Sequence, residues 1–155
     1  MDGSPLPQVY QCWDFCSEFW YNIGFGTGYP HTGPNHSAYE CWTESKTANA
    51  GNKFTLIYDK TQIKQGDVIV YNYFTGNPYG HIGFADEDYN GTDNMQLLSQ
   101  NNDATKVTVH NYSLSHFLGA FRYNAWHEPT PTPGGRAGRS NFKWVLYARK
   151  LRSKR

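Results

Sequence analysis

The stretch GDVIVYNYFTGNPYGHIGFADEDY, residues 66–89, decides the fold predicted for this chain. Two runs rich in β-branched and aromatic residues, at 66–74 and 81–89, flank the turn sequence GNPYG at 76–80. Such runs on either side of a glycine- and proline-containing turn are typical of a β-hairpin. The stretch therefore predicts two neighbouring antiparallel strands.

Further strands and two helices are predicted outside this hairpin. Residues 12–22 repeat apolar side chains every four positions without Pro or Gly, which predicts a helix. A second helix is expected over roughly 36–46, with Asn35 as its N-cap. Runs with a period of two predict strands at 54–59, 95–101, 106–112 and 119–124. This order indicates an α+β fold, with N-terminal helices packed on an antiparallel sheet of about five to six strands.

The length and composition suit one globular domain followed by a polar tail. The chain has 155 residues, 38% of them hydrophobic and 17% charged, and includes 12 Tyr, 9 Phe and 5 Trp. This is enough for a single core. We predict a folded domain over 1–127, a Pro/Gly-rich linker over 128–140 and a basic C-terminal tail over 141–155.

Charge is distributed unevenly between these parts. Residues 1–127 hold 6 Lys/Arg against 12 Asp/Glu, whereas residues 128–155 hold 8 Lys/Arg against one glutamate. A basic tail on an acidic body indicates either an anionic partner for the tail or a solvated charge run. The acidic body carries no recognised nucleic-acid-binding motif, so no nucleic-acid partner is expected.

The N-terminal sequence MDGSPLPQVY predicts no secretion signal, because it lacks an apolar run. Nothing in the chain approaches the ~18 consecutive apolar residues of a membrane span. We therefore expect a protein that is made and kept in a cytoplasm unless something else releases it. A monomer is also expected.

Two cysteines and two histidines have a spacing close to that of a zinc finger. Cys12, Cys16, His31 and His36 read C-x3-C-x14-H-x4-H. A finger needs both histidines on one face of a helix, and Pro34 between them would break that helix. The cysteines would also need a hairpin where the sequence predicts a helix. The spacing therefore does not predict zinc, and no cofactor is expected.

The two neighbouring cysteines do not predict a disulfide either. Their Cβ atoms would lie about 5–6 Å apart on a helix, whereas a disulfide needs about 3.5–4.5 Å. Cys16 and Cys41 fit the usual role of a small buried hydrophobe. Cys12 stands in the first turn of the predicted helix, where free N–H groups and the helix dipole lower the pKa of a thiol. Cys12 is therefore either part of the core or a nucleophile.

Among the six histidines, His81 is best placed to serve as a base. It opens a predicted strand in YGHIGF, where small neighbours leave its imidazole accessible. In the next predicted strand, MQLLSQN, Ser99 and Asn101 share one face and Gln100 lies on the other. An Asn amide oxygen can accept an imidazole N–H and fix the tautomer, so Asn101 is a candidate orienting residue.

Taken in order, QCWDF, GDVIVY, YGHIGF and LSQN resemble the CHAP family of cysteine- and histidine-dependent amidohydrolases and peptidases. This family has a papain-like fold and is common in phage endolysins and bacterial wall hydrolases. The resemblance covers about residues 8–124 and makes 1–127 a CHAP catalytic domain. It implies that Cys12 is the nucleophile and His81 the general base.

The remaining site residues follow the family pattern less closely. The position of the family's common Glu is Ser99 here, while the following Asn is kept as Asn101, so Asn101 is preferred and Ser99 is a second contact. Gln11 either donates to an oxyanion beside the Cys12 N–H or faces solvent. Some members bind calcium through Asp residues around the cysteine. Only Asp14 matches that pattern, so no metal is expected, and Asp14 suits the helix dipole instead.

The resemblance implies a peptidoglycan hydrolase that cuts amide bonds of the bacterial cell wall. Its activity would be that of an endopeptidase or an N-acetylmuramoyl-L-alanine amidase, giving lysis of Gram-positive cells. The expected partners are peptidoglycan and, through the basic tail, anionic wall polymers. The expected setting is that of a phage endolysin, held in the host cytoplasm until its release to the wall. The alternative is a non-catalytic wall-binding module of the same fold.

Overall fold

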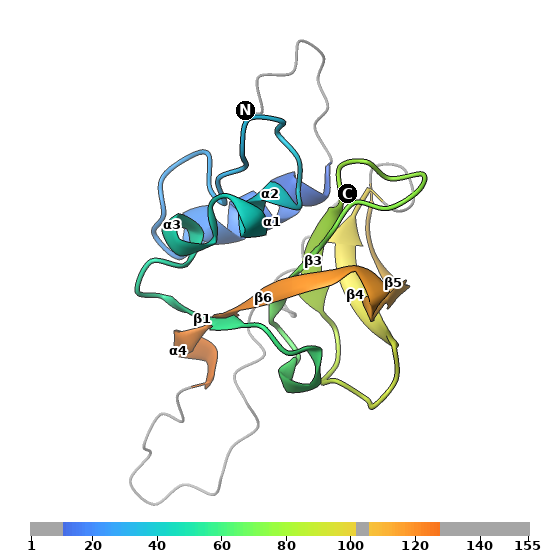
Figure 1. Cartoon of the computed structure of the whole chain (residues 1–155). Helices are drawn as coiled ribbons and strands as arrows, with labels where there is room; N and C mark the ends of the chain where they lie inside the picture. Colours follow the sequence, from blue (N-terminus) through green and yellow to red (C-terminus); the bar gives the residue numbers. More distant parts are fainter. Residues whose placement is uncertain (1–10, 102–105, 128–155) are drawn as a thin grey trace, which may run out of the picture.

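The computed structural model of the chain describes residues 11–101 and 106–127 (Figure 1). The predicted linker and basic tail lie outside the described residues. The helices are α1 (Cys12–Asn22), α2 (Glu40–Thr43), α3 (Lys46–Ala50) and α4 (Asn124–His127), with 3-10 turns η1 (Lys60–Gln62) and η2 (Leu114–His116). The strands are β1 (Phe54–Ile57), β2 (Val68–Tyr71), β3 (His81–Ala85), β4 (Asn94–Gln100), β5 (Val107–Ser113) and β6 (Phe117–Tyr123).

The six strands form one antiparallel sheet in the order β1-β6-β2-β3-β4-β5. The predicted hairpin is β2 and β3, which pair from Val68 opposite Phe84 to Tyr71 opposite His81. The last strand, β6, returns between β1 and β2. The predicted α+β fold, with N-terminal helices packed on an antiparallel sheet, is therefore confirmed.

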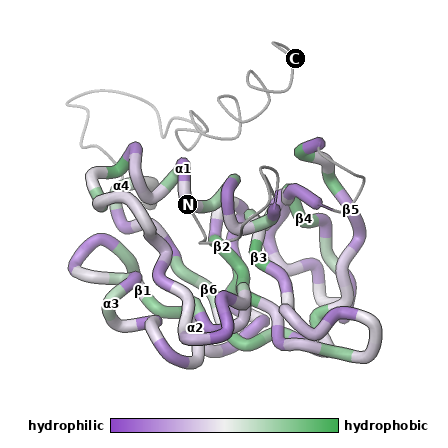
Figure 2. The backbone as a smooth tube through the Cα atoms, turned by 90° about the horizontal axis from the view of Figure 1, so that it is seen from above, coloured by the Kyte–Doolittle hydropathy of each residue, from purple (hydrophilic) through white to green (hydrophobic). Residues whose placement is uncertain are grey.

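The alternation along β2 divides the interior into two hydrophobic clusters. Val68 and Val70 pack with the helices on one face of the sheet. Ile69 and Tyr71 pack on the other face, against residues such as Met95 from β4. All four residues of β2 are buried, and Figure 2 shows the apolar stretches of β2 and β3 in the middle of the domain. The central strands therefore hold both layers together.

Helix α1 confirms the predicted helix at 12–22 and lies against the sheet (Figure 1). Its buried Phe19 packs edge-to-face on Phe84 of β3, with ring centroids 5.3 Å apart. Trp20 stacks on Phe54 of β1 at 4.7 Å, and its Nε1–H donates to the Asn49 carbonyl at 2.8 Å. These ring contacts fix the helix, and thus its first residue, relative to β3.

In the part of the chain that the structure describes, no helix is long and apolar enough to cross a membrane.

The single helix predicted over 36–46 is wrong, because the structure has two short helices, α2 and α3, after a folded loop. The reason is Glu40, whose buried carboxylate accepts the Ser37 N–H at 2.9 Å and the Asn35 side-chain amide at 2.9 Å. Asn35 is therefore bound to Glu40 and does not cap a helix. His36, with φ of 52°, also has a backbone that no helix contains.

A buried ion pair joins the start of β2 to β6. Asp67 is fully buried, and its carboxylate accepts Arg122 Nε–H at 2.9 Å and an Arg122 terminal N–H at 2.7 Å. The same carboxylate accepts the Lys64 N–H at 2.8 Å, which closes the turn before β2. Asp67 thus sets the position of the hairpin that carries His81.

Candidate active site

Cys12 is the first residue of α1 and lies at the N-terminal end of the helix. Gln11, the N-cap, is extended, and its N–H donates to the Asp14 carboxylate at 2.8 Å. Asp14 in turn donates its N–H to the Gln11 carbonyl at 3.1 Å. Asp14 therefore serves the helix start, as its position in the first turn predicts. The proposed oxyanion role of Gln11 stays a prediction.

Cys12 lies against β3, beside the residue that follows the predicted base. The backbone N–H of Ile82, the residue that follows His81, faces the Cys12 sulfur and lowers its pKa. Burial has the larger and opposite effect and raises the pKa of the Cys12 thiol to about 11. The expectation of a lowered pKa at the helix start is therefore wrong, because desolvation exceeds the stabilisation by backbone N–H groups. Cys12 is a neutral thiol at neutral pH.

His81 is buried at the start of β3 and is held on one edge by a hydroxyl. Its Nε2 lies 2.9 Å from Ser99 Oγ of β4. Burial, and secondarily the charge of His110, lower the pKa of His81 from its ordinary 6.5 to about 4. The imidazole is therefore neutral at neutral pH, with a proton-accepting nitrogen.

A glycine makes the contact between His81 and Ser99 sterically feasible. A Cβ built on Gly83 would lie 2.7 Å from the Ser99 Cβ and 3.0 Å from the Leu98 carbonyl oxygen. Any side chain at this position would therefore push β4 away from β3. Gly83, in the motif YGHIGF, thus allows Ser99 to come within hydrogen-bond distance of His81.

Asn101 does not lie where the sequence predicted. It follows the end of β4 with a φ of 70° and is exposed, whereas Ser99 is buried against His81. Strand alternation places Asn101 on the Ser99 face only while the strand continues, and the strand ends at Gln100. The hydrogen bond to the imidazole is therefore assigned to Ser99, in correction of the preference for Asn101.

The other cysteines and histidines do not assemble around Cys12 as ligands. Cys16 on α1 and Cys41 on α2 are completely buried in the same hydrophobic cluster, which confirms that they are packing residues. His36 is exposed, and His31 packs against the Tyr29 ring. Within residues 11–101 and 106–127, no group of three or more His, Cys, Asp and Glu side chains could hold a metal ion.

One residue of the site escaped the sequence reasoning. Tyr112 of β5 stacks on the His81 ring, with centroids 4.7 Å apart and planes 6° apart. The alternation in KVTVHNY places Tyr112 and His110 on one face of β5. That pattern indicates that the two side chains share one face of the sheet. It does not show which residues of other strands they contact.

The lowered pKa of His81 predicts that the fold weakens in mild acid. Between pH 6.5 and about 4 the unfolded chain binds a proton at His81 that the folded chain does not bind, so the free energy of unfolding falls as the pH falls. We expect this group to remove about 2 kcal/mol between pH 7 and pH 5. Urea unfolding of the wild type and His81→Gln at both pH values measures it.

The contribution of His81 is the difference between the wild type and His81→Gln in the loss of unfolding free energy from pH 7 to pH 5. His36→Gln, at an exposed histidine, is the matched control and should keep the wild-type dependence. Equal losses of stability in the wild type and His81→Gln would contradict the prediction.

The chain is similar to one protein family and to solved structures. A family model described as CHAP domain matches residues 2–101. Among solved structures, the crystal structure of Ly7917 is 23% identical with a TM-score of 0.48, and the match covers 73% of this chain and 53% of that chain. A structure of Ly7917 with the hydrolyzing product of MDP is 22% identical with a TM-score of 0.45 and has the same coverage. The chain thus spans about half the length of these solved proteins. No curated protein matches it.

Proposed function

The chain belongs to the CHAP domain family, and from that premise we propose that it hydrolyses amide bonds of bacterial peptidoglycan with Cys12 as nucleophile and His81 as base. The observation that carries the proposal is the position of Cys12 at the start of α1, with its sulfur at the N–H of the residue that follows His81. A nucleophile beside a base that a third group orients is the arrangement of covalent acyl transfer.

The neutral resting state of both groups supports general-base attack. Ser99 engages Nε2 of His81, so Nδ1 is the ring nitrogen that accepts the Cys12 proton. The Cys12 sulfur then bonds to the carbonyl carbon of the substrate. As the tetrahedral intermediate collapses, the carbon–nitrogen bond breaks and His81 returns the proton to the leaving amine.

Water completes the cycle through the same base. His81 accepts a proton from water, the resulting hydroxide attacks the thioester carbonyl, and the bond to sulfur breaks. The products are a carboxylic acid and the thiol of Cys12, which receives its proton back from His81. The backbone N–H of Cys12, with Gln11 beside it, is the proposed donor to the oxyanion of both tetrahedral intermediates.

Digestion of purified Gram-positive peptidoglycan, followed by mass spectrometry of the soluble fragments, tests this function. New amino groups on stem or cross-bridge peptides would identify an endopeptidase, and separation of stem peptides from muramic acid would identify an amidase. Protein that is alkylated at Cys12 is the control and should release nothing. Binding to peptidoglycan with no released fragments would contradict the proposal and favour a non-catalytic wall-binding module.

The finer setting is proposed on the same basis. An endolysin that lyses Gram-positive cells should clear a suspension of such cells when added from outside. The basic tail, which lies outside the described residues, would hold the enzyme near anionic wall polymers. Removing residues 141–155 should then lower clearance more at low than at high ionic strength, because salt screens the attraction.

A further inference from the structure

We propose that Tyr112 is a positioning residue of the active site, whose ring holds the plane of the His81 imidazole and stabilises the imidazolium that forms when Cys12 gives up its proton. The inference rests on the proposed function for its catalytic consequence. It rests on the structure for its geometry, since Tyr112 lies on β5, far from Cys12 and His81 in the sequence.

The stacking of the two rings is the first argument. The His81 and Tyr112 rings are nearly parallel, at an angle of 6°, with centroids 4.7 Å apart. An imidazole held by one hydrogen bond at Nε2 can still rotate about that contact. A flat ring stacked on its face removes this freedom, so that Nδ1 keeps one direction.

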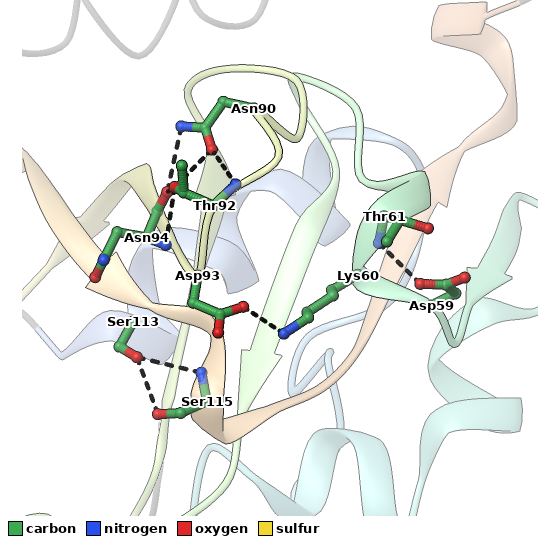
Figure 3. Close-up of polar contacts among 9 residues, drawn as sticks. All are labelled: Asp59, Lys60, Thr61, Asn90, Thr92, Asp93, Asn94, Ser113 and Ser115. Atoms are coloured by element: carbon green, nitrogen blue, oxygen red, sulfur yellow. Dashed lines mark hydrogen bonds and ion pairs between the residues drawn. The ribbon is translucent and has the colours of Figure 1, made fainter.

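Tyr112 is itself held in place from two sides. Its ring packs against Tyr71 of β2, with centroids 5.2 Å apart, and Tyr71 is almost completely buried. Beyond Tyr112 the chain is anchored where the Leu114 N–H donates to the Asp93 carbonyl at 2.7 Å. Figure 3 shows further polar contacts in this region, where Asp93 pairs with Lys60 and the Ser113 hydroxyl contacts Ser115. The ring is therefore a fixed surface.

Tyr112 also lies close enough to the nucleophile to feel its charge. Burial raises the pKa of the Tyr112 phenol to about 12, and the charge of a Cys12 thiolate contributes to the same shift. The phenol is therefore neutral at every pH at which the enzyme would work. A neutral aromatic face beside His81 leaves the ring electrons available to a cation.

The composition of the site explains why such a face is needed. The groups near His81 are Ser99 on β4, Tyr112 and His110 on β5, and Tyr71, which lies opposite His81 in the β2–β3 pair. Cys12 on α1 lies at the N–H of the next residue, Ile82. The hydrogen-bond partner of Nε2 is a neutral hydroxyl, which carries no charge to balance an imidazolium. The Tyr112 ring supplies part of that stabilisation through its electron-rich face.

Two substitutions at Tyr112 separate the contribution of the aromatic ring from that of its hydroxyl. Tyr112→Leu removes the aromatic face, and we expect kcat for peptidoglycan to fall about 10-fold with KM nearly unchanged. Tyr112→Phe keeps the face and should recover most of that rate. Tyr21→Leu, at a tyrosine that is 61% exposed on α1, is the matched control and should leave the rate unchanged.

A measurement without peptidoglycan makes the inference independent of the proposed substrate. Below the pKa of Cys12, iodoacetamide reacts with the small population of thiolate–imidazolium pairs, so its rate at Cys12 reports the stability of the imidazolium. We expect alkylation of Cys12 at pH 7, followed by peptide mass spectrometry, to slow about 10-fold in Tyr112→Leu and to recover in Tyr112→Phe.

The outcomes are distinct. Slower alkylation in Tyr112→Leu with recovery in Tyr112→Phe supports the inference even if peptidoglycan is not cut, in which case only the proposed substrate fails. An equal or faster alkylation rate in Tyr112→Leu would overturn it, because a merely structural loss exposes the thiol. A Tyr112→Phe variant as slow as Tyr112→Leu would also overturn it, because the hydroxyl would then matter and not the ring.

Discussion

Replacing Cys12 with alanine is expected to abolish the release of peptidoglycan fragments, with a loss of at least about 10³-fold in kcat/KM. Without the sulfur no thioester forms, and His81 has no thiol to deprotonate. The measurement is the rate of appearance of soluble fragments from purified peptidoglycan, with thermal unfolding to show that the variant keeps its fold.

The neighbouring cysteine provides the control for this result. Cys16 lies one turn further along the same helix and is completely buried in the same core. Cys16→Ala removes a sulfur of the same kind from the same helix and should retain activity at a modest cost in stability. Full activity in Cys12→Ala, or a folded but inactive Cys16→Ala, would contradict the assignment of the nucleophile.

Replacing Asp67 with alanine is expected to cost about 3–5 kcal/mol in the free energy of unfolding. The substitution leaves Arg122, whose side chain is 20% exposed, without its bidentate partner and leaves the Lys64 N–H without its acceptor. Burial of an uncompensated charge is among the most destabilising single changes. Urea unfolding at pH 7 measures the loss.

An exposed carboxylate on a nearby turn gives the comparison. Asp88 pairs with Lys64 at 3.1 Å, but both side chains are more than half exposed. Asp88→Ala should therefore cost less than about 1 kcal/mol. Equal losses in Asp67→Ala and Asp88→Ala would show that the pair with Arg122 does not stabilise the fold as argued.

Local patterns were sufficient for most of the secondary structure. The four-residue spacing at 12–22 gave α1 with its observed bounds, because an amphipathic helix needs only its own sequence and one apolar surface. The alternation at 66–74 and 81–89 gave the hairpin, although the strands β2 and β3 are shorter than these runs. The helix expected over 36–46 failed, because Glu40 bonds to a loop that periodicity does not describe.

The candidate site, too, was predictable from the sequence only in part. Motifs and their order were enough to select Cys12 and His81 as candidates, and the structure places the Cys12 sulfur at the N–H of the residue that follows His81. The choice between Ser99 and Asn101 depended on where β4 ends, which is a matter of strand pairing and not of local pattern. The stacking of Tyr112 on His81 depends on the order and register of the strands in the sheet, and no spacing along the chain encodes these.

By itself the sequence determined the α+β class, the first helix and the hairpin, and it made Cys12 and His81 the candidates for nucleophile and base. These follow from periodicity and from residue chemistry, which act over a few neighbouring residues. Only the tertiary structure decided that burial raises the pKa of Cys12, that Ser99 Oγ lies within hydrogen-bond distance of His81 and that the Tyr112 ring stacks on the imidazole. Each of these depends on burial or on contacts between distant strands, and burial reversed the sign of the pKa shift that the helix start alone would give.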